Sequence, residues 1–170
     1  MKTMKKFGFT AMAALAIALS SCSSDSDGGS GSNAATYINA SVDGTAFETF
    51  EVQGQSSASA SRIVSGSDTF ITITGVSSTT DAMEIVLHNI TATGTYPAGP
   101  SNDLTLVYSA TSSQMAYASD ADCTGATGTV TVTSISDTKI EGTFSFTGKT
   151  DDCTGQKAVT NGKFRGTFAN

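Results

Sequence analysis

The chain has 170 residues, of which 38% are apolar and 14% are charged, and its formal net charge is −6. This length suits one domain with a hydrophobic core and is too short for two of ordinary size. With 27 Thr and 24 Ser the chain is rich in hydroxyl groups, but its apolar share is too high for a disordered chain. The sequence therefore predicts one folded domain, and no motif in it specifies a reaction.

Residues 1–21 have the layout of a bacterial signal peptide. Three lysines come first, and a mainly apolar stretch, residues 7–19, follows. Because a helix that spans a bilayer needs about 20 apolar residues, this stretch predicts a secretory signal and not a membrane span. The sequence Leu19-Ser20-Ser21-Cys22 resembles the bacterial lipobox, which implies that the thiol of Cys22 is acylated and that the chain is cut before it. Ordinary secretion, with Cys22 incidental, is the alternative.

Residues 22–34 are expected to form a flexible tether between the acylated cysteine and the domain. They are rich in Ser, Gly and Asp and contain nothing to bury. The Ser and Asp residues directly after Cys22 resemble the acidic export signals of lipoproteins from the Bacteroidota. We therefore expect an outer-membrane lipoprotein that faces either the cell surface, which we favour, or the periplasm.

The charge balance limits the partners of the mature chain. Removal of residues 1–21 takes away three of the nine basic residues and none of the 15 acidic ones, so the net charge falls from −6 to −9. Nucleic acid needs a basic surface, so it is not an expected partner. We expect a monomeric domain that touches the membrane through its lipid and binds an unknown envelope or extracellular ligand.

Residues 35–170 are expected to form the folded domain, and their pattern is that of β-strands. Short runs of alternating apolar and polar residues are separated by turn residues, and no stretch has helical periodicity. The expected strands include 38–42, 46–52, 70–76, 82–90, 104–109 and 115–118. About nine to eleven short strands indicate an all-β fold, either an antiparallel β-sandwich or a closed, barrel-like variant.

Two dipeptides have the chemistry of tight hairpin turns. Asp43-Gly44 and Asn161-Gly162 each stand between alternating runs, and both tolerate the positive φ angles of a type I′ turn. Each therefore predicts a hairpin. In a later run, Ile135 falls out of phase with the preceding valines, which predicts a bulge or an early turn around residues 136–138.

Cys123 and Cys153 remain as an even pair once Cys22 is set aside. Both occur in the tetrapeptide Asp-Cys-Thr-Gly, on either side of two alternating runs. An antiparallel register that pairs Val132 with Phe144 also puts the two cysteines opposite each other, although registers shifted by two residues keep the same faces. In an oxidising compartment this predicts a structural disulfide. The missing Cys-x-x-Cys spacing argues against a redox-active pair.

The predicted bridge would gather acidic residues in two loops, namely Asp120, Asp122, Asp151 and Asp152. Carboxylate oxygens suit Ca²⁺, so these loops are a candidate cation site, with simple solvation as the alternative. His88 is the only histidine, and one imidazole cannot supply the ligand sets of the usual zinc sites or, without a marked nucleophile, a catalytic triad. We expect it to be an ordinary strand residue.

A sugar-stacking platform would have to use tyrosine, because Trp is absent. The candidates are Tyr37, Tyr96, Tyr108 and Tyr117, each of which is also explained as a strand or turn residue. A second polar feature is a threonine ladder on one strand face, at Thr127, Thr129, Thr131 and Thr133. No repeat extends the ladder into a flat water-ordering surface, so we interpret it as the solvated face of a strand.

Three passages of turns and strand ends carry a resemblance. They are residues 39–47 (NASVDGTAF), 94–99 (GTYPAG) and, near the end, 142–146 (GTFSF) with 159–164 (VTNGKF). Together they resemble a family of small Bacteroidota lipoproteins of unknown function. The resemblance covers most of residues 38–168, implies fold and localisation, and carries over no catalytic residue.

The sequence is thus most consistent with a lipid-anchored cell-envelope β-domain, a non-catalytic binding or envelope-associated module. The alternative is a small hydrolase whose carboxylate pair the sequence does not mark. Its acids would come from Glu48, Glu51, Glu84 and Glu141 or from the aspartates. A purely structural envelope component is a third interpretation.

Overall fold

The structure, a computed structural model, describes residues 35–99 and 102–169. The expected signal peptide, the Cys22 acylation site and the tether lie outside these residues. Among the residues described, no helix is long and apolar enough to cross a membrane.

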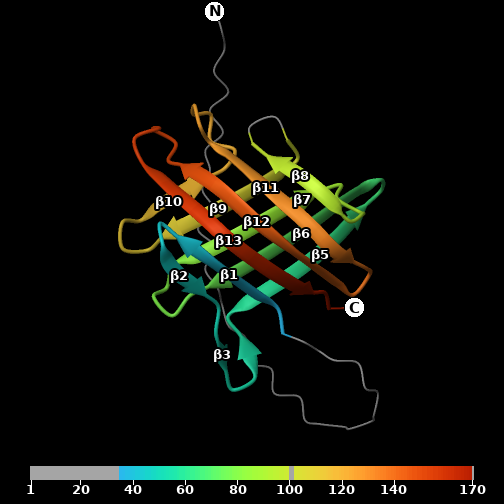
Figure 1. The fold of residues 1–170 in the computed structure, drawn as a ribbon. Helices are drawn as coiled ribbons and strands as arrows, with labels where there is room; N and C mark the ends of the chain where they lie inside the picture. Colours follow the sequence, from blue (N-terminus) through green and yellow to red (C-terminus); the bar gives the residue numbers. More distant parts are fainter. Residues whose placement is uncertain (1–34, 100–101, 170) are drawn as a thin grey trace, which may run out of the picture. The chain divides into compact units, whose positions relative to one another are not determined.

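Thirteen strands and no helix make up the regular structure of the described residues (Figure 1). In chain order they are β1 (Tyr37–Val42), β2 (Thr45–Glu48), β3 (Glu51–Val52), β4 (Gln55–Ser56), β5 (Ala58–Ser65), β6 (Asp68–Val76), β7 (Ala82–His88), β8 (Gly94–Ala98), β9 (Leu104–Ala110), β10 (Met115–Ala118), β11 (Thr127–Ile135), β12 (Lys139–Lys149) and β13 (Gln156–Thr167). The all-β prediction is confirmed. The strands outnumber the nine to eleven expected, because the expected strand 46–52 is divided into β2 and β3, and because β4, β5 and β8 are not among the strands that the sequence predicts.

Eleven of the strands form one antiparallel sheet that curls back on itself. Hydrogen-bonded neighbours follow in the order β2-β1-β13-β12-β10-β9-β7-β6-β5, and β11 and β8 branch from β12. The sheet splits into two layers where β12 meets β10, since only Ala118 and Lys149 pair there. In Figure 1 the layer of β1, β13, β12, β11 and β8 lies in front of the layer of β10, β9, β7, β6 and β5, and the strands of the two layers cross. The expected antiparallel, two-layered fold is confirmed, and its two layers belong to one sheet that curls into a half-barrel.

The two layers bury their apolar faces against each other. The largest side chains with less than 2% exposure include Ile71, Ile73, Ile85 and Leu87 from one layer and Ile38, Val130, Ile140 and Phe164 from the other. Full burial of such a side chain stabilises the fold by roughly 1.5–3 kcal/mol. Since successive residues of a strand point to opposite faces, this inward apolar set leaves the alternating polar residues on the outside of each layer.

The second predicted hairpin is wrong. Strand β13 runs through Asn161-Gly162 without turning, and pairs with β1 on one side and β12 on the other. Asn161 has a φ of 54°, and both registers shift near this point, so the dipeptide forms a β-bulge. Asn-Gly satisfies a left-handed bulge residue as well as it satisfies a hairpin turn. The first predicted hairpin, at Asp43-Gly44, is confirmed between β1 and β2.

The disulfide between Cys123 and Cys153 is confirmed, with Cα atoms 5.6 Å apart. The favoured strand register is not observed, because Val130 lies opposite Phe144 in one of the registers shifted by two residues. Both cysteines lie beyond the paired strands, in loops that bring them together. The bulge predicted near Ile135 is confirmed, since the register shifts just after Val132.

Candidate functional site

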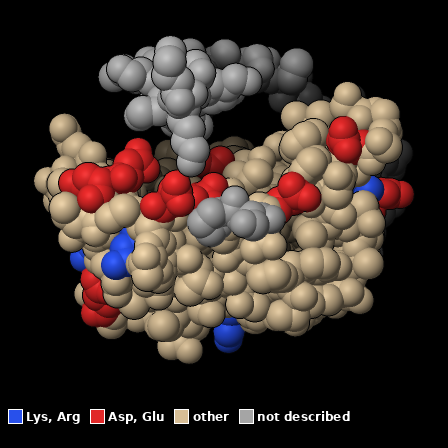
Figure 2. Space-filling model, turned by 90° about the horizontal axis from the view of Figure 1, so that it is seen from above, with Lys and Arg blue, Asp and Glu red and all other residues tan. Residues whose placement is uncertain are grey.

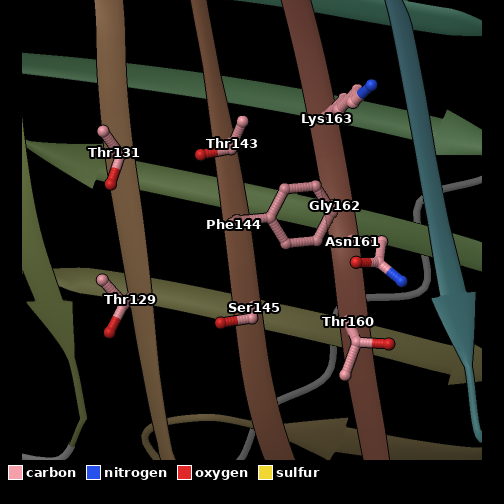
Figure 3. Close-up of a pocket in the computed structure, with 9 residues that line it drawn as sticks. All are labelled: Thr129, Thr131, Thr143, Phe144, Ser145, Thr160, Asn161, Gly162 and Lys163. Atoms are coloured by element: carbon pink, nitrogen blue, oxygen red, sulfur yellow. The ribbon is translucent and has the colours of Figure 1, made fainter.

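An open depression of about 740 Å³ lies on the outer face of β11, β12 and β13 (Figure 3). Its lining residues are Thr129, Thr131, Thr143, Phe144, Ser145, Thr160, Asn161, Gly162 and Lys163. A second hollow of about 220 Å³ shares Thr129, Ser145 and Thr160 with the first and continues to Thr127 and Thr147. We call this continuous surface the hydroxyl groove.

The groove follows directly from strand alternation. On β11 and β12 the even-numbered residues 128–132 and 140–148 point into the core, so the odd-numbered hydroxyl residues point outward. Pairing then sets them in rows: Thr131 lies opposite Thr143, Thr129 opposite Ser145, and Thr127 opposite Thr147. At about 3.3 Å per residue, the three rows span about 13 Å along the strands. The groove is thus long enough for a chain-like ligand.

The bulge in β13 shapes one wall of the groove. Gly162 packs against Phe144 so closely that a Cβ atom there would lie 2.5 Å from the carbonyl oxygen of Phe144. The extra residue, Asn161, keeps its exposed side chain at the groove, between Thr160 and Lys163 in the chain. Figure 3 shows these residues along β13, beside the hydroxyl residues of β12. A polar amide and an ammonium group therefore join the hydroxyls.

Most polar groups of the groove have no partner in the part of the chain that the structure describes. No hydrogen bond is found there for the side chains of Thr129, Thr143, Ser145, Thr160, Asn161 and Lys163. Thr131 differs, since its hydroxyl lies 3.0 Å from that of Thr95 on β8. Elsewhere hydroxyl groups form hydrogen bonds within the fold; for example, Oγ of Ser119 accepts a hydrogen bond from the backbone N–H of Leu106. The groove thus presents donors and acceptors that only solvent or a ligand can satisfy.

The charge around the groove differs from that of the whole protein. On the strands that carry the groove, β11, β12 and β13, the basic residues that point outward are Lys139, Lys149, Lys163 and Arg165, and the only acidic one is Glu141. The described part of the chain holds 6 basic and 13 acidic residues. This face is therefore positive in an acidic protein.

Glu141 forms ion pairs with two neighbouring basic side chains. Its Oε1 atom lies 2.6 Å from Nε of Arg165, and its Oε2 atom lies 3.5 Å from Nζ of Lys139. The hydrogen bond from Arg165 is the main reason that the pKa of Glu141 lies below its usual range. Glu141 is thus ionised and paired, and it leaves Lys163 without an ion-pair partner among the described residues.

A separate cleft of about 250 Å³ lies between the β1–β2 turn and the start of β7. Lys157 donates a hydrogen bond of 2.8 Å to Asp43, and the hydroxyl of Tyr108 donates one of 2.8 Å to Asp81. Asp81 also accepts the backbone N–H of Thr111 at 3.0 Å. Two aspartates and a lysine meet in this cleft, and each is held by a neighbouring group: Asp43 by Lys157, and Asp81 by Tyr108 and Thr111.

The pKa shifts in this cleft do not match those of a general acid. The hydrogen bond from Lys157 lowers the pKa of Asp43, and Asp43 in turn raises the pKa of Lys157. Burial, followed by the hydrogen bond to Asp81, raises the pKa of Tyr108 to about 12. A catalytic acid needs a carboxyl group whose pKa is raised toward neutrality, and Asp43 is shifted the opposite way.

The candidate tyrosines do not form an exposed platform. Tyr108 and Tyr117 are buried and stack on each other, with ring centroids 6.2 Å apart. Tyr96 is half-buried, and its hydroxyl donates to the carbonyl of Ala92. Arg165 covers the ring of Tyr37 at 5.5 Å. These rings stabilise the fold, and sugar stacking on Tyr108 or Tyr117 is not compatible with their burial.

The loops joined by the disulfide carry the four aspartates of the candidate cation site. Asp152 accepts hydrogen bonds from Thr150 and Thr154, which lower its pKa, and Asp120 accepts the hydroxyl of Thr105. Figure 2 shows that acidic residues outnumber basic ones on one end of the domain. Across residues 35–99 and 102–169, however, no three His, Cys, Asp or Glu residues gather closely enough to hold a metal ion.

His88 lies in a strand, as predicted, but it is the last residue of β7, because this strand ends two residues before the expected boundary at residue 90. Its ring stacks on Phe70 with centroids 4.4 Å apart. Asp103 and Asp68 lie 3.5 Å and 3.8 Å from its two nitrogens. His88, Asp68 and Asp103 do not form a group that could hold a metal ion, and the chain has no second histidine, so we interpret His88 as a strand residue.

Sequence reasoning found only one side of the groove. The ladder at Thr127, Thr129, Thr131 and Thr133 was visible, but the extension to Thr143, Ser145, Thr160 and Lys163 was not. The alternation of β12 was a usable signal for Thr143 and Ser145. Thr160 and Lys163 could not be placed on one continuous strand, because the Asn161-Gly162 pair between them is typical of a hairpin turn.

The fold and the groove define an all-β, two-layered antiparallel domain with one disulfide and a hydroxyl-rich outer face. Residues 36–167 match the model of a family described as a domain of unknown function, DUF6252. The chain belongs to this family. No curated protein and no solved structure matches it.

Proposed function

We propose that this protein is a lipid-anchored envelope domain that binds a polyhydroxylated ligand, a glycan, in the hydroxyl groove, without catalysis. The observation that carries the proposal is the set of six polar side chains in the groove that have no partner among the described residues. A glycan presents many hydroxyls that can both donate and accept hydrogen bonds, as threonine and serine hydroxyls do.

The shape and stiffness of the groove support this ligand class. Threonine is branched at Cβ, which restricts its χ1 angle, so little side-chain entropy is lost when its hydroxyl binds. Each neutral hydrogen bond contributes only about 0.5–1.5 kcal/mol net. An open groove of such groups therefore needs several contacts at once, and it suits an extended oligosaccharide better than a single small molecule.

Anchoring through Cys22 belongs to the same proposal. The expected signal peptide, cysteine and acidic tether would keep the domain at the outer membrane, on the cell surface in our favoured interpretation. Labelling of growing cells with a fatty-acid analogue tests this. We expect incorporation into the wild-type chain and none into Cys22→Ala. Protease treatment of intact cells distinguishes the two faces, since only a surface-exposed domain is degraded.

Affinity electrophoresis of the detergent-solubilised full-length protein tests the binding site. Gels contain either dextran, which is neutral, or polygalacturonate, which is acidic. We expect retardation of the wild type and loss of retardation for the double variant Thr129→Val/Thr143→Val, which removes two hydroxyls and keeps the shape. The matched control is Thr72→Val, on the outward face of β6 in the other layer. The site would be refuted if the double variant were retarded as strongly as the wild type. It would also be refuted if neither polymer retarded the wild type.

A further inference from the structure

We infer that the ligand of the hydroxyl groove carries a carboxylate, as a uronic acid does, and that Lys163 binds this group. The inference rests on the proposed glycan-binding function and adds the class of glycan. It starts from the position of Lys163 on β13, opposite Thr143 of β12 and lining the groove (Figure 3).

Lys163 is the one charged residue that lines the main hollow. It is exposed, and it has no ion-pair or hydrogen-bond partner in the described part of the chain. The nearest acidic residue by register, Glu141, is bound to Arg165 and Lys139. An ammonium group that is left unneutralised beside a row of hydroxyls is complementary to a ligand with both hydroxyls and an anionic group.

The surrounding charge favours approach of an anion on this face. Lys139, Lys149 and Arg165 share the outward side of β12 and β13 with Lys163, and only Glu141 opposes them. In a protein with 15 acidic residues and a net charge of −6, this face is the one to which an anionic chain is attracted. A neutral glycan would gain nothing from this arrangement.

The remaining groove residues fit a sugar and not a bare anion. Thr129, Ser145 and Thr160 continue the lining away from Lys163 into the second hollow. A free phosphate or carboxylate ion would occupy only the lysine end and leave these hydroxyls to solvent. A chain of uronic acid units would bind the ammonium through one carboxylate and the hydroxyl rows through its ring hydroxyls.

Titration calorimetry of the detergent-solubilised full-length protein tests the inference with three probes: pentagalacturonate, maltopentaose and inorganic phosphate. We expect pentagalacturonate to bind about tenfold more tightly than maltopentaose, as a charge-assisted hydrogen bond allows. Its affinity should fall as salt rises. Phosphate alone should bind more weakly than pentagalacturonate.

Variants separate the role of Lys163 from general charge. Lys163→Gln should remove most of the preference for pentagalacturonate, and Lys163→Arg should restore it. Lys149→Gln is the matched control, since Lys149 lies outward on β12, has no ion pair among the described residues and does not line the hollows. It should change the affinity less than twofold. Unfolding curves of each variant confirm that it is folded.

The outcomes distinguish the inference from the proposed function. Equal binding of both oligosaccharides, unchanged by Lys163→Gln, would overturn the uronate inference and leave glycan binding intact. Phosphate binding as tight as that of pentagalacturonate would also overturn it, because the site would then recognise a free anion. No binding of either oligosaccharide would contradict both proposals.

Discussion

The Nζ atom of Lys157 lies 2.8 Å from the Oδ2 atom of Asp43, a contact between residues 114 positions apart in the chain. Asp43 also accepts the backbone N–H of Ala158 at 2.9 Å. These two bonds tie the β1–β2 turn to the start of β13, next to the small cleft. They lower the pKa of Asp43 and raise that of Lys157.

Replacement of Asp43 by Asn should therefore destabilise the fold in a pH-dependent way. The folded-state pKa of Asp43 is lowered, so its contribution is complete above the unfolded pKa, near pH 4, and is lost as the pH falls through the folded-state value. Both side chains are partly exposed, which limits the loss at pH 7 to about 0.5 kcal/mol. Urea unfolding of both proteins at pH 7 and pH 2.5 measures this. A difference as large at pH 2.5 as at pH 7 would contradict it.

Gly162 should not tolerate a side chain. A Cβ atom there would lie 2.5 Å from the carbonyl oxygen of Phe144 and 2.6 Å from its ring. We expect Gly162→Ala to lower the free energy of unfolding by about 2 kcal/mol or more. The control is Gly66→Ala, where φ is 63° but the space is open, so about 1 kcal/mol is expected. Denaturant unfolding with equal losses for both would disprove the close approach.

Loss of the disulfide should destabilise the domain by about 3–4 kcal/mol. Cys123 and Cys153 are 30 residues apart, and the chain-entropy relation gives this figure for a loop of that size. Denaturant unfolding of the wild type and of Cys123→Ser/Cys153→Ser compares the two. Thiol counting on the unreduced, denatured protein should detect neither cysteine as free. Two reactive thiols from these positions would contradict the bridge.

Tyr108 should remain protonated well above the usual tyrosine range. Burial and the hydrogen bond to Asp81 raise its pKa to about 12. Because the folded-state pKa exceeds the unfolded value near 10, the stability it contributes is complete below pH 10 and is lost between about pH 10 and pH 12. Ultraviolet titration at 25 °C should show a phenolate component near pH 12 that Tyr108→Phe removes. A titration unchanged by this substitution would contradict the assignment.

The strands were predictable where alternation and turn chemistry agree. Residues 70–76 and 82–88 alternate cleanly, and Asp43-Gly44 forms the predicted turn between β1 and β2. Strand β8 was missed because Gly94 and Pro97 are typical of turns. Pro97 is tolerated there because β8 pairs with β11 alone and is an edge strand.

The site was harder to predict because it depends on register. Alternation shows that Thr129 and Thr143 each lie on an outward face, but only strand pairing places Thr131 beside Thr143 and Thr143 beside Lys163. Registers that differ by two residues keep the same faces. The loops that carry Cys123 and Cys153 did not resolve this ambiguity, because they lie outside the ladder.

Chemical-shift mapping by NMR with pentagalacturonate tests the central claim most directly, because it locates the ligand on the protein. If the hydroxyl groove is the binding site, the largest shifts fall on Thr129, Thr143, Ser145 and Lys163, and residues of the outward face of β6 are unaffected. Shifts concentrated around Asp43, Asp81 and Tyr108, or the absence of any localised shift, would contradict the account.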